Sequence, residues 1–236
     1  MEPPPVVVLV HGAWHGPWAW ASVAGLLSGE GIRSIAVDLP SKGADTAVLG
    51  DLHDDAEVVR GAVEGAGASA LIVAHSYGGL PVSEGLAETP NAAHLIYLAA
   101  FMLAPGESLL GLRGGVEPEW WLTSEDGRSL FPADPVGIFY SDCPPVVARS
   151  AAAALVPQRK DSFCQELRAA AWQRVPSTYV VCGRDNAVPP AAQARMSARA
   201  GTVSHIDSGH SPFLSRPAEV TAIIKETLAT VVAEAG

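Results

Sequence analysis

A serine lies between an apolar run and two glycines in the segment AHSYGG, residues 74–79. The preceding run ALIVA, residues 70–74, is typical of a buried strand, and the residues after the glycines are typical of a helix. A serine between a strand and a helix can act as a nucleophile where the backbone turns sharply. Such a turn needs small residues two positions before and two positions after the serine. Ala74 and Gly78 meet that need. Ser76 is therefore the predicted nucleophile, with a helix N-cap as its other common role.

A serine nucleophile needs a base that takes its proton and an acid that orients the base. Asp185 follows the strand-like run TYVVC, and His210 lies in the loop SGHSP before the last predicted helix. Both therefore come after the carboxyl end of a predicted strand, as Ser76 does. Because the carboxyl ends of parallel strands meet at one edge of a sheet, we expect the three side chains to come together.

Other titratable residues are weaker candidates for base and acid. His75 adjoins the serine, but on such a turn its side chain points away from the nucleophile. His205 lies within a predicted strand and is expected to be packed, whereas His94 is expected at the surface. Asp207 precedes His210 by only three residues and is too near along the loop to be preferred.

The loop HGAWHGPWAW, residues 11–20, follows the first apolar run. A tetrahedral intermediate of acyl transfer needs two preorganised N–H donors for its oxyanion. We expect one from Tyr77, the residue after the nucleophile, and the other from Ala13 in this loop. Gly12 lets the backbone turn inward without a Cβ atom. Gly12 and Pro17 could also simply cap a helix, and both interpretations can hold together.

The rest of the chain predicts the elements that must position these residues. Short β-rich runs alternate with helical patterns, as in an α/β fold whose parallel strands are covered on both faces. The predicted strands are 6–10, 34–38, 70–74, 95–100, 178–182 and 202–206, and the predicted helices are 17–29, 52–66, 79–88, 189–200 and 217–234. This pattern predicts a doubly wound, mostly parallel sheet of about six strands in one domain, residues 1–236.

Residues 103–175 interrupt this alternation with a segment that holds no convincing parallel strand but several aromatic residues. An insertion this long is typical of a lid or cap, and a small second domain is the alternative. We expect a helical cap. Together with Gly12 and Trp14, its residues Trp120, Trp121 and Phe139 are the predicted substrate-binding residues, for an apolar or aromatic acyl group.

Composition narrows the classes of function. The chain has 236 residues, 48% of them hydrophobic, and a formal net charge of −10. An acidic chain without blocks of Lys or Arg is not expected to bind nucleic acid or an anionic membrane. Three cysteines without ligand spacing predict neither a disulfide framework nor a metal site. We expect a cytoplasmic protein of bacterial origin, in which Arg predominates over Lys; whether it forms a homodimer is left open.

Five motifs together resemble the α/β-hydrolases of the branch that contains plant methylesterases, hydroxynitrile lyases and related bacterial esterases. They are VHGAWHGPWAW, VDLPSKGAD, AHSYGG, GRDNAVPP and GHSPFLSRP. The resemblance implies a triad of Ser76, Asp185 and His210, oxyanion donors at Ala13 and Tyr77, a helical cap and no cofactor. It departs mildly at Ala74, where the turn more often has glycine.

Three functions remain open on the sequence. The first is hydrolysis of a small to medium carboxylic ester through an acyl-enzyme; the second is a lyase or other non-hydrolytic reaction in the same pocket. The third is a ligand receptor that keeps the fold without the activity. Hydroxynitrile lyases of this branch carry a threonine and a lysine that handle the cyanohydrin and cyanide. The resemblance implies that Gly12 and Ser211 occupy those two positions in this chain. That difference favours the ester hydrolase.

Overall fold

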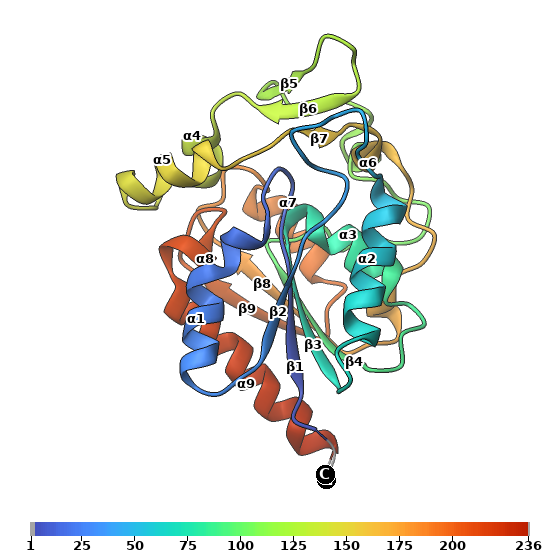
Figure 1. The fold of residues 1–236 in the computed structure, drawn as a ribbon, viewed down its shortest axis with the longest axis vertical. Coiled ribbons are helices and arrows are strands. Elements are labelled where there is room, and N and C mark those ends of the chain that lie inside the picture. The colour runs from blue at the N-terminus through green and yellow to red at the C-terminus, as the bar shows by residue number, and fades with distance from the viewer. Residues whose placement is uncertain (1–2, 236) are drawn as a thin grey trace.

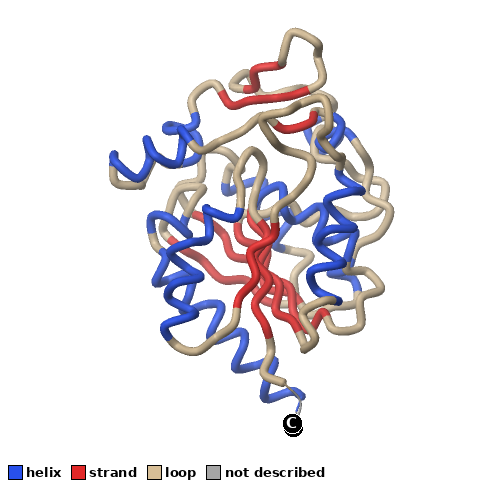
Figure 2. Tube along the Cα trace, in the orientation of Figure 1, coloured by secondary structure: helices blue, strands red, loops and turns tan. Residues whose placement is uncertain are grey.

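A central sheet lies between two layers of helices (Figure 2). The computed structural model describes residues 3–235, so residues 1, 2 and 236 of the predicted domain lie outside it. The six strands of this sheet lie in the order β2-β1-β3-β4-β8-β9, and every neighbouring pair is parallel. Their bounds are Val6–Val10 (β1), Ser34–Val37 (β2), Ala70–His75 (β3), Ala92–Leu98 (β4), Ser177–Cys182 (β8) and Thr202–Ile206 (β9). The predicted fold class is confirmed.

The strands are apolar because both faces of the sheet are covered. In β1, Val7 and Leu9 belong to one buried cluster, whereas Val8 and Val10 belong to the other. This division follows from the alternation of side chains along a strand. Helices α1 (Ala21–Gly29), α8 (Pro212–Ser215) and α9 (Pro217–Ala235) cover one face, and α2 (Leu52–Glu64), α3 (Gly79–Gly85) and α7 (Pro190–Ser197) cover the other (Figure 1). None of the helices within residues 3–235 has the length and apolar character needed to cross a membrane.

Helix α2 begins at a capping box. The Asp51 side chain accepts hydrogen bonds from the backbone N–H groups of His53 and Asp54, and the Asp54 side chain accepts one from the N–H of Asp51. These bonds satisfy donors that the first turn of a helix leaves free. The buried face of α2 consists of Leu52, Asp55, Ala56, Val59 and Val63. One carboxyl group therefore lies inside an otherwise apolar interface.

Between β4 and β8 the chain leaves the main sheet. This insertion holds helices α4 (Pro135–Phe139), α5 (Pro145–Ala153) and α6 (Asp161–Cys164), and an antiparallel sheet of β5 (Trp121–Thr123), β6 (Ser129–Pro132) and β7 (Gln158–Arg159). The sequence predicted only helices in the cap and missed the small sheet. Its strands of two to four residues are too short to show the alternating pattern of a strand. In Figure 1 it lies above the carboxyl ends of the parallel strands. Its role as a cap stays a prediction.

Candidate active site

The turn after β3 places Ser76 in a conformation that few serines adopt. Its φ angle is 51°, in the left-handed region that disfavours residues with a Cβ atom. The chain can pass here only beside small residues, because a Cβ atom on Gly78 would come 2.5 Å from the carbonyl oxygen of His11. Ala74, two positions before the serine, is fully buried. Strain of this kind, held by tight packing, is what the sharp turn predicted for a nucleophile requires.

Asp185 and His210 form a buried hydrogen-bonded pair. The Nδ1–H of His210 donates to Asp185 Oδ2 at 2.7 Å, and both side chains are almost wholly buried. Asp185 Oδ1 accepts two more hydrogen bonds, from the backbone N–H groups of Ala187 at 2.8 Å and Val188 at 2.9 Å. The carboxylate is therefore fixed in orientation, and it fixes the histidine tautomer with a proton on Nδ1.

Gln193 supports this pair and was not predicted. Its side chain is fully buried on α7. The amide nitrogen donates to Asp185 Oδ2 at 3.1 Å, and the amide oxygen accepts from the backbone N–H of Cys182 at the end of β8. This one residue ties the aspartate to its strand. A lone glutamine on a predicted helix gives no sequence signal for such a role.

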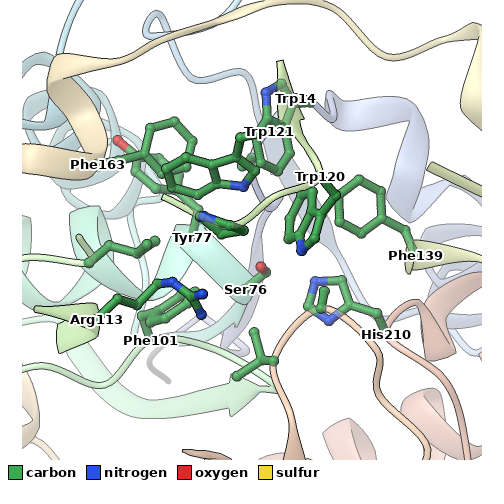
Figure 3. Close-up of a pocket in the computed structure, with 15 residues that line it drawn as sticks. Trp14, Ser76, Tyr77, Phe101, Arg113, Trp120, Trp121, Phe139, Phe163 and His210 are labelled. Atoms are coloured by element: carbon green, nitrogen blue, oxygen red, sulfur yellow. The ribbon is translucent and has the colours of Figure 1, made fainter. Parts of the chain in front are cut away.

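Ser76 and His210 line the same cavity, which encloses about 390 Å³ of empty space, including the part open to solvent. In Figure 3 the Ser76 hydroxyl points into the cavity, with the His210 ring beside it. Because Nδ1 of His210 is engaged with Asp185, Nε2 is the ring nitrogen left for a proton transfer. The structure thus brings the three predicted residues to one place.

Two histidines orient the peptide groups of the loop after β1. His11 Nδ1–H donates to the carbonyl oxygen of Gly12 at 2.8 Å, and His15 Nδ1–H donates to that of Ala13 at 2.7 Å. In a trans peptide the N–H points opposite to the carbonyl. The Ala13 N–H therefore faces away from His11, and among the described residues it donates to no protein acceptor. The predicted oxyanion donor is free to receive a ligand.

The N–H of the next peptide in the loop already donates a hydrogen bond within the protein. The Trp14 N–H donates to Gln158 Oε1 at 2.8 Å, so this donor is not available to a substrate. The Tyr77 side chain, beyond the nucleophile, donates from its hydroxyl to Asp55 Oδ2 at 2.7 Å. Both segments of the predicted oxyanion hole are thus anchored to buried polar groups. Neither Gln158 nor Asp55 was predicted.

Burial keeps the neighbouring histidines neutral. It lowers the pKa of His15 to about 3, and lowers the pKa of His75 well below its ordinary value. His15 Nε2 accepts from the Tyr140 hydroxyl at 2.8 Å, and His75 Nε2–H donates to the carbonyl oxygen of His210 at 2.9 Å. These rings position backbone around the site. His75 faces the His210 backbone, as expected for a side chain that points away from the nucleophile.

Aromatic side chains make most of the cavity wall. Of the predicted substrate-binding residues, Trp14, Trp120, Trp121 and Phe139 line it. The other lining residues, apart from Ala13, Ser76, Tyr77 and His210, are Phe101, Leu109, Arg113, Pro118, Phe163, Ala187 and Val188. The prediction missed these, of which Phe163 alone is an aromatic residue of the insertion. Trp14 stacks on both Phe139 and Phe163, with ring centroids 5.6 and 5.4 Å apart.

Three expectations need correction. Gly12 does not line the cavity; a Cβ atom there would come 2.7 Å from His75 Nδ1 and 2.9 Å from Ser76 Cβ, so it packs behind the nucleophile. His94 is buried, since β4 is a central strand, and its Nε2 is 2.9 Å from the Thr178 hydroxyl. His205 is exposed, because its strand β9 forms the sheet edge.

Residues 7–223 match the sequence model of the alpha/beta hydrolase family. The chain belongs to the alpha/beta hydrolase family. It is 32% identical to alpha/beta hydrolase nvfD of Aspergillus novofumigatus, an alignment that covers 94% of this chain and 95% of that protein. It is 26% identical to methyl jasmonate esterase 1 of Vitis vinifera, over 93% and 95% of the two chains.

Solved structures share the fold of this chain. A pyrethroid hydrolase from Sphingobium faniae superposes with a TM-score of 0.81 at 22% identity, over 96% of this chain and 98% of that one. Within residues 3–235, no group of three or more His, Cys, Asp or Glu side chains could hold a metal ion.

Proposed function

We propose that this protein hydrolyses a small to medium apolar or aromatic carboxylic ester through an acyl-enzyme on Ser76. The observation that carries the proposal is the buried Asp185–His210 pair beside a strained serine in one cavity. Activated nucleophiles of this kind need a base in reach and a third group that orients the base. The esterase and hydrolase names of the relatives support the same class of reaction.

In the proposed reaction, His210 Nε2 takes the proton of the Ser76 hydroxyl as Oγ attacks the ester carbonyl. The carbonyl oxygen gains negative charge and accepts hydrogen bonds from the N–H groups of Ala13 and Tyr77. His210 then gives the proton to the leaving alcohol, and a water repeats the sequence on the acyl-enzyme. Asp185 stabilises the imidazolium that forms in each half of the reaction and does not itself take the proton.

The cavity wall supports an apolar or aromatic acyl group. Its lining residues include five Trp or Phe rings from the loop after β1 and the insertion, and no Asp or Glu. Burial of apolar substrate surface against such rings is favourable, and their packing restricts its shape. We further propose that residues 103–175 act as the cap of the site. The seven lining residues contributed by this segment support that role.

A lyase in the same pocket is the competing function. The resemblance to hydroxynitrile lyases puts Gly12 and Ser211 of this chain where those enzymes carry threonine and lysine. Gly12 has no room for a side chain, and Ser211 is fully buried and outside the cavity lining. Neither glycine nor serine carries a positive charge, so neither position supplies a cation that would stabilise a departing cyanide.

We expect measurable hydrolysis of phenyl acetate and p-nitrophenyl esters, with negligible release of cyanide from mandelonitrile or acetone cyanohydrin. Phenol or nitrophenol release and cyanide release, measured on the same enzyme preparation, provide the comparison. The control is Ser76→Ala, which should lose the ester activity. Efficient cyanide release that depends on Ser76, without ester turnover, would replace the hydrolase by the lyase.

Cap residues should control the choice among esters. Trp120 lies 5.8 Å from Trp14 and 5.6 Å from Phe139 between ring centroids, so Trp120→Ala opens the aromatic wall. We expect the relative kcat/KM for bulky and small acyl groups to change about tenfold, while reactivity toward a small fluorophosphonate changes less. Leu122→Ala is the matched control, because Leu122 is 53% exposed on β5 and does not line the cavity. Equal losses on every ester would instead indicate damaged packing.

A further inference from the structure

A second hollow adjoins the active-site cavity. It encloses about 840 Å³ of empty space, including the part open to solvent. It is lined by Phe101, Leu112, Arg113, Val116, Ala187, Val188, Pro189, Ala192 and Arg195. Four of these residues, Phe101, Arg113, Ala187 and Val188, also line the cavity that contains Ser76. The outer hollow therefore lies directly beside the cavity that contains Ser76.

The charge of the outer hollow is of one sign. Among the described residues, Arg113 and Arg195 are the only charged side chains that line it, and no Asp or Glu lines either hollow. In Figure 3 the guanidinium group of Arg113 lies beside Phe101 and extends toward Ser76. Its Nε–H donates to the carbonyl oxygen of Val116 at 3.2 Å, which leaves both terminal nitrogens of the guanidinium for another acceptor.

These two arginines differ from most others in the chain. Arg199, for example, pairs with Glu107 at 2.7 Å, and Arg184 pairs with Asp207 at 2.8 Å. Neither Arg113 nor Arg195 has a carboxylate within ion-pair distance among residues 3–235. The formal net charge of the chain is −10, so the protein as a whole repels anions. Two unpaired arginines beside the candidate active site attract anions locally.

We propose that the outer hollow binds a carboxylate of the substrate, so that the preferred ester carries a free carboxylate at its far end. This inference rests on the proposed ester hydrolysis and names its substrate class, for which half-esters of dicarboxylic acids are the simplest case. The ester carbonyl lies at Ser76, the apolar chain runs along the aromatic wall and Phe101, and the carboxylate lies between Arg113 and Arg195. A guanidinium fork suits a carboxylate because it can donate two parallel hydrogen bonds.

The test compares monomethyl esters of straight-chain dicarboxylic acids with methyl esters of uncharged acids of the same chain length. The quantity measured is the ratio of kcat/KM for the charged ester to that for the neutral ester. We expect this ratio to exceed one at the chain length that reaches the outer hollow and to fall as salt screens the charges. Arg113→Gln and Arg195→Gln should each lower the ratio about fivefold, mainly by raising KM for the charged ester.

Arg149→Gln is the matched control. It removes the same charge from an exposed position on α5 that lines neither hollow, so the ratio should not change. Arg113→Glu should go further and favour an ester with a remote ammonium group over the half-ester. If neutral esters are hydrolysed and the ratio is the same in the wild type and all four variants, the carboxylate subsite is overturned while the proposed function stands.

Failure of the proposed function has a different signature. Binding of the half-ester to Ser76→Ala can be measured calorimetrically, without any turnover. If no ester is hydrolysed but binding of the half-ester weakens about fivefold on adding Arg113→Gln and not on adding Arg149→Gln, the anion site is supported and ester hydrolysis is wrong. If binding does not respond to Arg113 or Arg195, the anion site is overturned whatever the reaction is.

Discussion

A fluorophosphonate probe should form one covalent adduct with this protein, on Ser76, and Ser76→Ala should abolish it. Only an activated serine attacks such a phosphorus centre readily, and the strained turn presents this hydroxyl to the cavity beside His210. His210→Ala should lower kcat/KM for a p-nitrophenyl ester by about ten-thousand-fold, because the proton of Ser76 then has no acceptor. Intact-mass spectrometry reads the adduct, and initial rates read the turnover.

His205→Ala is the control for the histidine substitution. His205 is exposed on the edge strand β9 and takes no part in the site, so turnover should change less than twofold. His75→Ala is not a neutral control, since the His75 ring is buried and donates to the carbonyl oxygen of His210. An adduct that survives Ser76→Ala would mean that the nucleophile is another residue.

The three candidate catalytic residues could be found in the sequence because each has a local signal. Ser76 lies between small residues that a tight turn requires. Asp185 follows the apolar run TYVVC, and His210 follows the predicted strand 202–206 and precedes a predicted helix. The strands themselves were predictable because a parallel sheet covered on both faces needs continuous apolar runs. His94 and His205 were misplaced because a run of residues does not reveal which strand is central and which is at the edge.

The supporting polar groups could not be found in this way. Gln158 and Trp14 are 144 residues apart in the chain yet share a hydrogen bond, and nothing in either segment refers to the other. Asp55 follows His53 and Asp54 on a predicted helix, and three polar residues in a row are typical of a helix face exposed to solvent. It is buried only because α2 turns that position toward the sheet. Tertiary contacts, and not local pattern, decide such roles.

Asp55 should make the stability of the protein depend on pH. Its fully buried carboxyl group accepts from the Ser41 N–H at 2.9 Å, from the Ser41 hydroxyl at 2.6 Å and from the Tyr77 hydroxyl at 2.7 Å. The Ser41 hydroxyl in turn accepts from Gln158 Nε2 at 3.1 Å, and Gln158 holds the Trp14 N–H. The group therefore joins α2 to both segments of the candidate oxyanion hole.

Burial is the largest influence on this carboxyl group, and it raises the pKa of Asp55 to about 7 in spite of the three donors. A pKa raised by folding means that the folded protein holds a proton that the unfolded chain releases above its ordinary value of 3.8. The stabilising contribution is therefore complete below pH 3.8 and is lost as the pH rises through 7. A shift from 3.8 to about 7 corresponds to about 4 kcal/mol in the free energy of unfolding.

Asp55→Asn should remove this dependence, because the amide is neutral at every pH. The free energy of unfolding of the wild type minus that of Asp55→Asn should fall by about 3 kcal/mol between pH 4 and pH 7, with the rest of the shift outside this range. Urea titrations at several pH values provide the measurement, and other titrating groups cancel in the difference. Glu125→Gln is the control, since Glu125 is exposed and forms no ion pair among residues 3–235, so its difference from the wild type should change much less. If both differences are flat, the Asp55 carboxyl is ionised in the folded protein throughout that range, and its three donors outweigh its burial.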